Sequence, residues 1–171
     1  MSIVFPEYRQ FDSTDCGPAC LKMISQYYGK NYSLQSLRER CFISRQGVSM
    51  LGISDAAESI GFRTRGVKLS LQELIDNKPY PCIIHWNQNH FVVCYGSSKH
   101  GRLFKISDPA RGKYEIDRTG FEKCWLSMQE NGKSKGNALL LEPTPTFYEQ
   151  KEDRTQSSSN LAFYLRYLKP Y

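Results

Sequence analysis

The spacing of apolar residues changes along this chain of 171 residues, from helical periodicity in the first half to short strand-like runs in the second. Helices are expected at about residues 16–28, after Ser33, at about 49–60, after Ser70 and, as a short element, after Thr119. Strands are expected at residues 63–67, 81–86, 90–95, 103–107, 113–116 and 138–141. The sequence therefore predicts an α+β fold, with an N-terminal helical half packed on a C-terminal antiparallel sheet and a cleft between them.

Residues suited to helix starts support several of these helices. Pro18 fits a first helical turn, and Asp15 is the expected N-cap before it. Ser70 and Thr119 each stand three residues before a glutamate, which is the spacing of a capping box. The first helix is therefore expected to begin close to Cys16.

Cys16 is a candidate nucleophile because of this position. The unpaired backbone N–H groups and partial positive charge of a helix N-terminus favour a thiolate over a thiol. The alternative is that Cys16 is a buried packing residue, which is the usual role of a free cysteine. Its position alone leaves both interpretations open.

A nucleophilic cysteine needs a base, and the chain has three histidines. His90 opens the apolar run that predicts the strand at 90–95, so its ring is expected at a strand end that a cleft can reach. His85 ends the preceding strand, where a half-buried structural role is favoured, and His100 falls in a turn. His90 is therefore the preferred general base.

Two further residues can complete a catalytic set. An antiparallel return after the strand at 103–107 would bring Asp108 beside His90, where a carboxylate could hold the imidazole in one tautomer. An Asp-Pro pair also commonly starts a turn, and the two interpretations of Asp108 are equally supported. Gln10 lies six residues before Cys16 and can donate an amide N–H to an oxyanion, although a single upstream glutamine means little.

Four sequence blocks occur in one order along the chain, QFDSTDCGPAC, GVSMLGI, HFVV and ISDPA. Together they resemble the N-terminal, papain-like cysteine peptidase domain of bacteriocin-processing ABC transporters, over about residues 5 to 142. The resemblance implies roles for four residues, none of which departs from the family pattern. These are Cys16 as nucleophile, His90 as general base and acid, Asp108 as orienting residue and Gln10 as oxyanion donor.

The same resemblance implies an endopeptidase that removes the leader from a bacteriocin-like or secreted peptide precursor after a double-glycine type motif, with no cofactor and no metal. Its implied partners are that precursor and the transmembrane and nucleotide-binding domains of a transporter, fused or separate, at the cytoplasmic face of a bacterial membrane. Two alternatives stay open. One is a non-catalytic domain that only docks the export substrate, and the other is a Cys-His-Asp acyltransferase or amidase.

Composition and charge argue against other classes of protein. No apolar run approaches the length of a membrane span, and the first residues lack the features of a secretory signal, so this chain is expected to be soluble and cytosolic. The net charge of +6 comes from scattered residues, which argues against nucleic-acid binding. Residues 131–134 imitate the end of a phosphate-binding loop, but Ser127 stands where its first glycine belongs. Any ATPase is therefore expected outside this chain.

Five of the six cysteines are expected to pack in the core, because a chain with its own core in a reducing compartment needs no disulfides. A zinc site formed by Cys16, Cys20, His85 and His90 is disfavoured, since the spacing is uncommon and the metal would occupy the nucleophile.

The sequence predicts three parts in the chain. Residues 1–142 form the peptidase domain, and residues 143–160 form a polar linker that contains Pro143 and Pro145. Residues 161–171 form an amphipathic segment that leads towards a membrane domain absent from this chain. The pattern alone supports a membrane-surface helix and a helix docked on the same domain about equally.

Overall fold

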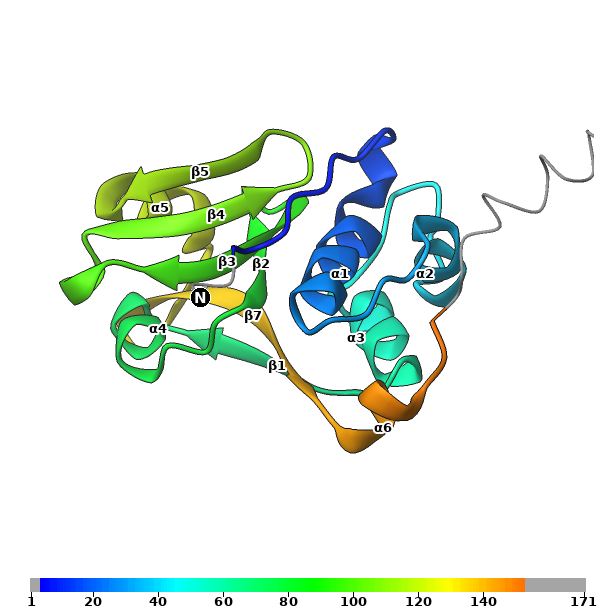
Figure 1. The fold of residues 1–171 in the computed structure, drawn as a ribbon. Coiled ribbons are helices and arrows are strands. Elements are labelled where there is room, and N and C mark those ends of the chain that lie inside the picture. The colour runs from blue at the N-terminus through cyan, green and yellow to red at the C-terminus, as the bar shows by residue number, and fades with distance from the viewer. Residues whose placement is uncertain (1–3, 153–171) are drawn as a thin grey trace, which may run out of the picture.

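The computed structural model describes residues 4–152, which form a group of helices beside a twisted sheet (Figure 1). In the helical half, a 3₁₀ turn, η1 (Ser13–Asp15), runs directly into α1 (Cys16–Tyr27), and α2 (Leu34–Arg40) and α3 (Met50–Ser59) follow. The side chains of Ser33 and Ser49 accept hydrogen bonds from the backbone N–H groups three residues later and so cap α2 and α3. The three helices expected in this half are confirmed.

The sheet has seven strands, and every pair of neighbouring strands is antiparallel. The strands are β1 (Phe62–Leu69), β2 (Cys82–Trp86), β3 (His90–Ser97), β4 (Leu103–Asp108), β5 (Gly112–Asp117), β6 (Met128–Glu130) and β7 (Lys133–Pro143). Their order is β1-β7-β2-β3-β4-β5, and β6 pairs with the start of β7. The predicted α+β class and the antiparallel sheet are therefore confirmed.

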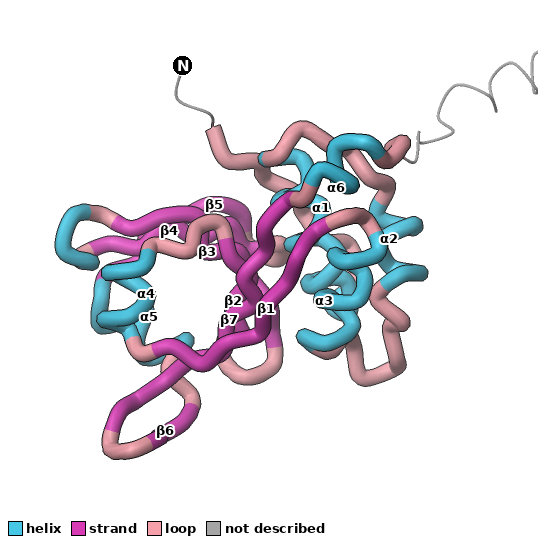
Figure 2. Tube along the Cα trace, turned by 90° about the horizontal axis from the view of Figure 1, so that it is seen from below, coloured by secondary structure: helices cyan, strands magenta, loops and turns pink. Residues whose placement is uncertain are grey.

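Both faces of the sheet are covered by apolar side chains. Successive residues of a strand point to opposite faces, so Ile83 joins the core shared with α1 to α3, whereas Ile84 joins a second core. This second core is closed by α4 (Leu71–Asn77) and α5 (Arg118–Trp125), which lie on the opposite side of the sheet from the other helices (Figure 2). Burial on both faces explains why β2 and β3 are continuous apolar runs in the sequence.

Capping of α4 and α5 follows the sequence only in part. The capping box that starts at Ser70 is confirmed, since Ser70 and Glu73 bond each other's backbone N–H groups. The box predicted to start at Thr119 is wrong. Asp117, the last residue of β5, caps α5 by accepting a 2.8 Å hydrogen bond from the N–H of Gly120, so the helix begins before Thr119.

The hairpin that β6 forms with the start of β7 is absent from the sequence prediction, because its residues are polar and do not alternate clearly. Asn131 and Gly132 form its two-residue turn, both with positive φ (52° and 73°), and Glu130 pairs with Lys133 across it. An Asn-Gly pair is a strong signal for such a turn. This turn explains residues 131–134, which imitate the end of a phosphate-binding loop in the sequence.

The folded unit extends beyond the boundary expected at Glu142. Within the segment predicted as a linker, α6 (Pro145–Glu149) buries the ring of Phe147 against Phe62, with 4.4 Å between ring centroids. The backbone N–H of Thr144 donates to the carbonyl of Gly61 at 3.1 Å. One buried aromatic ring thus outweighs the polar, proline-containing composition that suggests a linker.

The C-terminal part of the predicted chain organisation cannot be compared with the structure. The end of the predicted linker and the amphipathic segment at 161–171 lie outside the described residues. Within residues 4–152, no helix combines the length and the apolar character needed to cross a bilayer.

Candidate active site

The four predicted site residues lie where the helical half meets the sheet. Cys16 is the first residue of α1, His90 the first of β3 and Asp108 the last of β4, while Gln10 lies just before η1. Cys16 belongs to the apolar core that α1 shares with β3. Elements from both halves of the molecule therefore contribute to one site.

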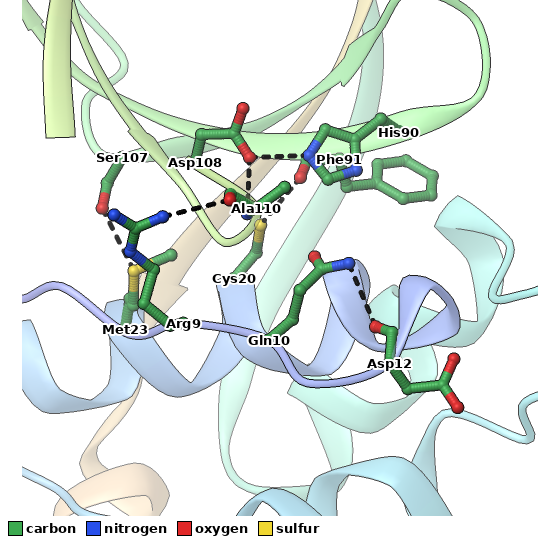
Figure 3. A network of polar contacts seen from close by, with 10 residues as sticks. All are labelled: Arg9, Gln10, Asp12, Cys20, Met23, His90, Phe91, Ser107, Asp108 and Ala110. Carbon is green, nitrogen blue, oxygen red and sulfur yellow. Dashed lines mark hydrogen bonds and ion pairs between the residues drawn. The ribbon is translucent and has the colours of Figure 1, made fainter. Parts of the chain in front are cut away.

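Strand pairing brings His90 and Asp108 together although they are 18 residues apart. In the antiparallel register of β3 and β4, Val93 is the partner of Ser107, so the start of β3 returns beside the end of β4. His90 Nε2 and Asp108 Oδ1 are 2.7 Å apart (Figure 3). This short contact is typical of a charge-assisted hydrogen bond.

The Asp108 carboxylate is held by a second donor. Its Oδ1 also accepts a 2.8 Å hydrogen bond from the backbone N–H of Ala110, and the residue is buried. Burial alone would raise the pKa of Asp108, but the hydrogen bonds from His90 and Ala110 outweigh it and lower that pKa. Asp108 is therefore a fixed negative charge beside the imidazole, and its Asp-Pro sequence is more than a turn.

The imidazole of His90 responds to these neighbours. Burial favours its neutral form, but the hydrogen bond with Asp108 and the nearby Cys16 side chain, as a thiolate, raise the pKa of His90 to about 9. The ring is therefore expected to carry a positive charge at neutral pH, with the thiol on one side and the carboxylate on the other.

The sulfur of Cys16 lies among buried groups, and the residue retains 6% of its exposure. Two further thiols approach it, from Cys20 one turn along α1 and from Cys41 at the end of α2, and burial raises the pKa of both. Cys20 donates to the carbonyl of Phe91 at 3.4 Å, which fixes it as a packing group between α1 and β3. Of these three thiols, Cys16 is the one that contributes to the raised pKa of His90.

Gln10 is attached to both halves of the site. Its backbone N–H donates to the carbonyl of Pro109 at 2.9 Å, and its side-chain Nε2 donates to the carbonyl of Asp12 at 3.0 Å (Figure 3). Its Oε1 is buried and has no hydrogen-bond partner among the described residues. The side-chain amide of Gln10 is thus held in the segment that precedes Cys16, and its Oε1 accepts no hydrogen bond from the described residues.

The expected role of Asp15 as the cap of α1 is wrong. It occupies the N-cap position, but its side chain makes no capping hydrogen bond. Its buried carboxylate lies instead 3.1 Å from Nε of Arg38 in α2. Capping falls to Asp12, which accepts a 3.0 Å hydrogen bond from the N–H of Thr14 at the start of η1.

The other two histidines lie outside this set. His85 is half-buried and stacks on Phe91 with 5.0 Å between ring centroids, and burial lowers the pKa of its imidazole. His100 lies in the short 3₁₀ turn between β3 and β4, with a left-handed φ of 66°. The structural role of His85 and the turn position of His100 agree with the sequence prediction.

A helical half that offers a thiol to a histidine–aspartate pair on an antiparallel sheet is the arrangement of a papain-like cysteine peptidase domain. Residues 5–131 match the model of the family described as Peptidase C39. The chain belongs to this peptidase family, which confirms the family expected from the four sequence blocks.

Curated relatives are much longer than this chain. The colicin V secretion/processing ATP-binding protein CvaB of Escherichia coli is 42% identical over 113 residues, which are 66% of this chain and 16% of the relative. The LcnC-like lactococcin transport/processing ATP-binding protein of Lactococcus lactis is 34% identical over 160 residues, 90% of this chain and 21% of the relative. The chain thus spans about a fifth of these relatives or less.

Solved structures agree with the fold. A double glycine motif protease from an AMS/PCAT transporter, in complex with its leader peptide, matches with a TM-score of 0.71 and 33% identity over 83% of this chain and 94% of that chain. The peptidase domain of Streptococcus ComA, described as a bifunctional ABC transporter, matches with a TM-score of 0.70 and 31% identity over 82% and 100%. The predicted papain-like fold is confirmed.

Proposed function

We propose that this chain is a cysteine endopeptidase that removes the leader from a secreted peptide precursor by cutting after a double-glycine type motif. The observation that carries this proposal is the environment of His90. Its ring is hydrogen-bonded to Asp108 at 2.7 Å, and the Cys16 side chain lies near enough to contribute to its raised pKa, which is the arrangement that activates a thiol nucleophile.

Acylation begins with the Cys16 thiolate. Its sulfur attacks the carbonyl carbon of the scissile bond and forms a tetrahedral oxyanion. Nε2 of His90 is held by Asp108, so Nδ1 is the ring nitrogen left to serve the thiol and the substrate. The imidazolium gives its proton to the leaving amine as the C–N bond breaks, and a thioester remains on Cys16.

Deacylation uses the same residues in the opposite sense. The neutral imidazole of His90 takes a proton from water, which attacks the thioester carbonyl. The C–S bond breaks, the carboxylic acid product leaves, and the thiolate and imidazolium are restored. Asp108 keeps the ring in one orientation throughout, because its Oδ1 is itself fixed by the N–H of Ala110.

Gln10 is the proposed side-chain donor to the oxyanion. Its Nε2 carries two hydrogens, and the hydrogen bond to the carbonyl of Asp12 uses one of them. The second N–H can donate to the oxygen that becomes charged in the transition state. The hydrogen bond to Asp12 thus orients the amide before substrate arrives.

The proposed substrate and partners rest on the functions of the relatives. CvaB and the LcnC-like protein are secretion or transport proteins with processing and ATP-binding functions, and the protease in the solved complex holds a leader peptide. For this chain we therefore propose a double-glycine precursor as substrate and the transmembrane and nucleotide-binding parts of an ABC transporter as partners. The cytoplasmic side of the membrane is the corresponding location.

The test is cleavage of a synthetic precursor whose leader ends in Gly-Gly, followed by mass spectrometry. We expect one cut after the second glycine, and no product from the Cys16→Ala variant. The matched control is Cys124→Ala, which removes a partly exposed thiol on α5 and should cut at the parent rate. Equal cleavage by Cys16→Ala and the parent would rule out the proposal.

The same experiment separates the two alternatives. A docking domain would bind the precursor and release no product. An acyltransferase would transfer the leader to an added amine, which appears as a mass adduct in place of the free carboxylate. Either result would replace hydrolysis as the activity of this site.

A further inference from the structure

Two carboxylates are buried in the described part of the chain, and the mechanism above uses only one of them. Asp108 is 3% exposed and bonds His90, whereas Asp15 is 2% exposed and immediately precedes Cys16. A buried carboxylate is costly unless it has a specific partner. The position of Asp15 beside the nucleophile calls for an explanation.

The carboxylate of Asp15 contacts α2 and does not cap the helix that it precedes. It makes no capping bond to α1, and its Oδ1 lies 3.1 Å from Nε of Arg38 on α2. This contact is an ion pair without the geometry of a hydrogen bond, because Asp15 Oδ1 has no hydrogen-bond partner within residues 4–152. The charge of Arg38 is therefore the main attraction that holds this oxygen in place.

A carboxylate beside a helix start interacts favourably with the helix dipole, so without another partner it is drawn towards the first turn of the helix. The backbone of Asp15 (φ −90°, ψ 3°) is not the extended one of a capping residue, because η1 runs directly into α1, so this movement would add no cap. It would bring a negative charge closer to the Cys16 sulfur, and like charges disfavour each other, so the thiolate would be less stable.

We propose that Arg38 is a positioning residue that holds the Asp15 carboxylate away from the N-terminus of α1, and thereby preserves the positive field in which the Cys16 thiolate forms. This inference rests on the proposed function, in which Cys16 is the nucleophile. It assigns to α2, which contributes no group to the reaction, a part in setting the reactivity of the thiol.

The other groups around the two residues are consistent with this arrangement. His90 faces Cys16 from β3, and the buried thiols of Cys20 and Cys41 face it with pKa values raised by burial, so both stay uncharged. Burial also raises the pKa of Asp15, while Arg38 lowers it and Asp12 raises it. The cation that acts on Asp15 is therefore Arg38.

The test measures how fast iodoacetamide alkylates Cys16 at each pH, by mass analysis of the peptide that carries this cysteine. In Arg38→Gln the released carboxylate should move towards α1 and shift the half-reactive pH of Cys16 upward by about one unit. Arg38→Lys keeps the charge and should stay near the parent. The matched control is Arg40→Gln, which removes the same charge from the same helix but not from Asp15.

The double variant Asp15→Asn with Arg38→Gln decides between two roles of the pair. Without the carboxylate there is no charge to oppose the thiolate, so its profile should return to that of the parent. If the pair only joins α1 to α2, the double variant would be no better than Arg38→Gln. That result, or an unshifted profile in Arg38→Gln, would overturn the inference.

Two further points keep the outcome interpretable. Arg38→Gln leaves the buried Asp15 carboxylate without its cation, so a thermal melt of each variant verifies that it is folded. Alkylation does not require the precursor peptide. A failure of the cleavage experiment is therefore distinguishable from a failure of the positioning role.

Discussion

The two sides of the site differ in how completely their polar atoms are bonded. On the sheet side, Asp108 accepts from both His90 and Ala110, and the three groups form one connected unit (Figure 3). On the helical side, Gln10 Oε1 and Asp15 Oδ1 are buried without a hydrogen-bond partner among the described residues. The hydrogen bonds of the sheet side are thus complete before substrate arrives, whereas those of the helical side are not.

This difference indicates a division of labour. An unpaired buried polar atom destabilises a protein by about 1–3 kcal/mol, so such atoms are uncommon without a functional reason. The sheet fixes the orientation and charge of His90, while Gln10, in the segment before α1, keeps an amide N–H for the oxyanion that forms during the reaction. Removing a group from each side should therefore produce different kinetic defects.

The largest defect is expected from the sheet side. His90→Gln keeps a polar side chain at the start of β3 but removes the proton donor and acceptor, and kcat/KM for precursor cleavage should fall about 10³-fold. His85→Gln is the matched control, because this ring stacks on Phe91 and is not bonded to Asp108, so its replacement should change the rate little. Equal losses in the two variants would mean that the Asp108-bonded histidine has no special role.

A smaller defect is expected from the helical side. Gln10→Ala removes the proposed oxyanion donor, and kcat should fall about 100-fold while KM changes little, because the interaction forms mainly in the transition state. Gln26→Ala removes an amide from the exposed side of α1, where it bonds Asn31, and serves as control. A rise in KM with unchanged kcat would instead place Gln10 in substrate binding.

The two sides also differ in how far the sequence predicts them. Gln10 and Cys16 stand six residues apart in one block, and local signals place the thiol at a helix start. His90 and Asp108 meet only through the register of β3 and β4, so the residues alone left the role of Asp108 undecided. Strand pairing is a tertiary property, and it is resolved by the structure.

Two errors of the sequence prediction have a common cause. The box at Thr119 and the cap at Asp15 both rest on a local capping signal. In each case an aspartate further upstream caps the helical segment: Asp117 accepts from the N–H of Gly120, and Asp12 accepts from the N–H of Thr14. A cap signal says that a side chain can bond a helix, but it does not say which of several candidates stands where the helical backbone begins.

The smallest expected change in rate tests whether the sheet side acts through its charge. Asp108→Asn keeps an oxygen that can accept from His90 Nε2 and from the N–H of Ala110, but removes the negative charge. We expect cleavage at neutral pH to fall only about tenfold, the equivalent of one pKa unit in the stability of the imidazolium. A change that preserves the geometry should thus cost less than loss of the ring.

The pH profile of Asp108→Asn is the more informative measurement. The imidazolium must donate a proton, so activity of the parent should decline as pH rises through the His90 pKa of about 9. Asp108 raises that pKa, so its neutral replacement lowers it, and the high-pH decline should begin at lower pH. A decline that stays near pH 9 would contradict this assignment. It would mean that the Cys16 thiolate alone stabilises the imidazolium, and that the electrostatic control of the site lies on the helical side.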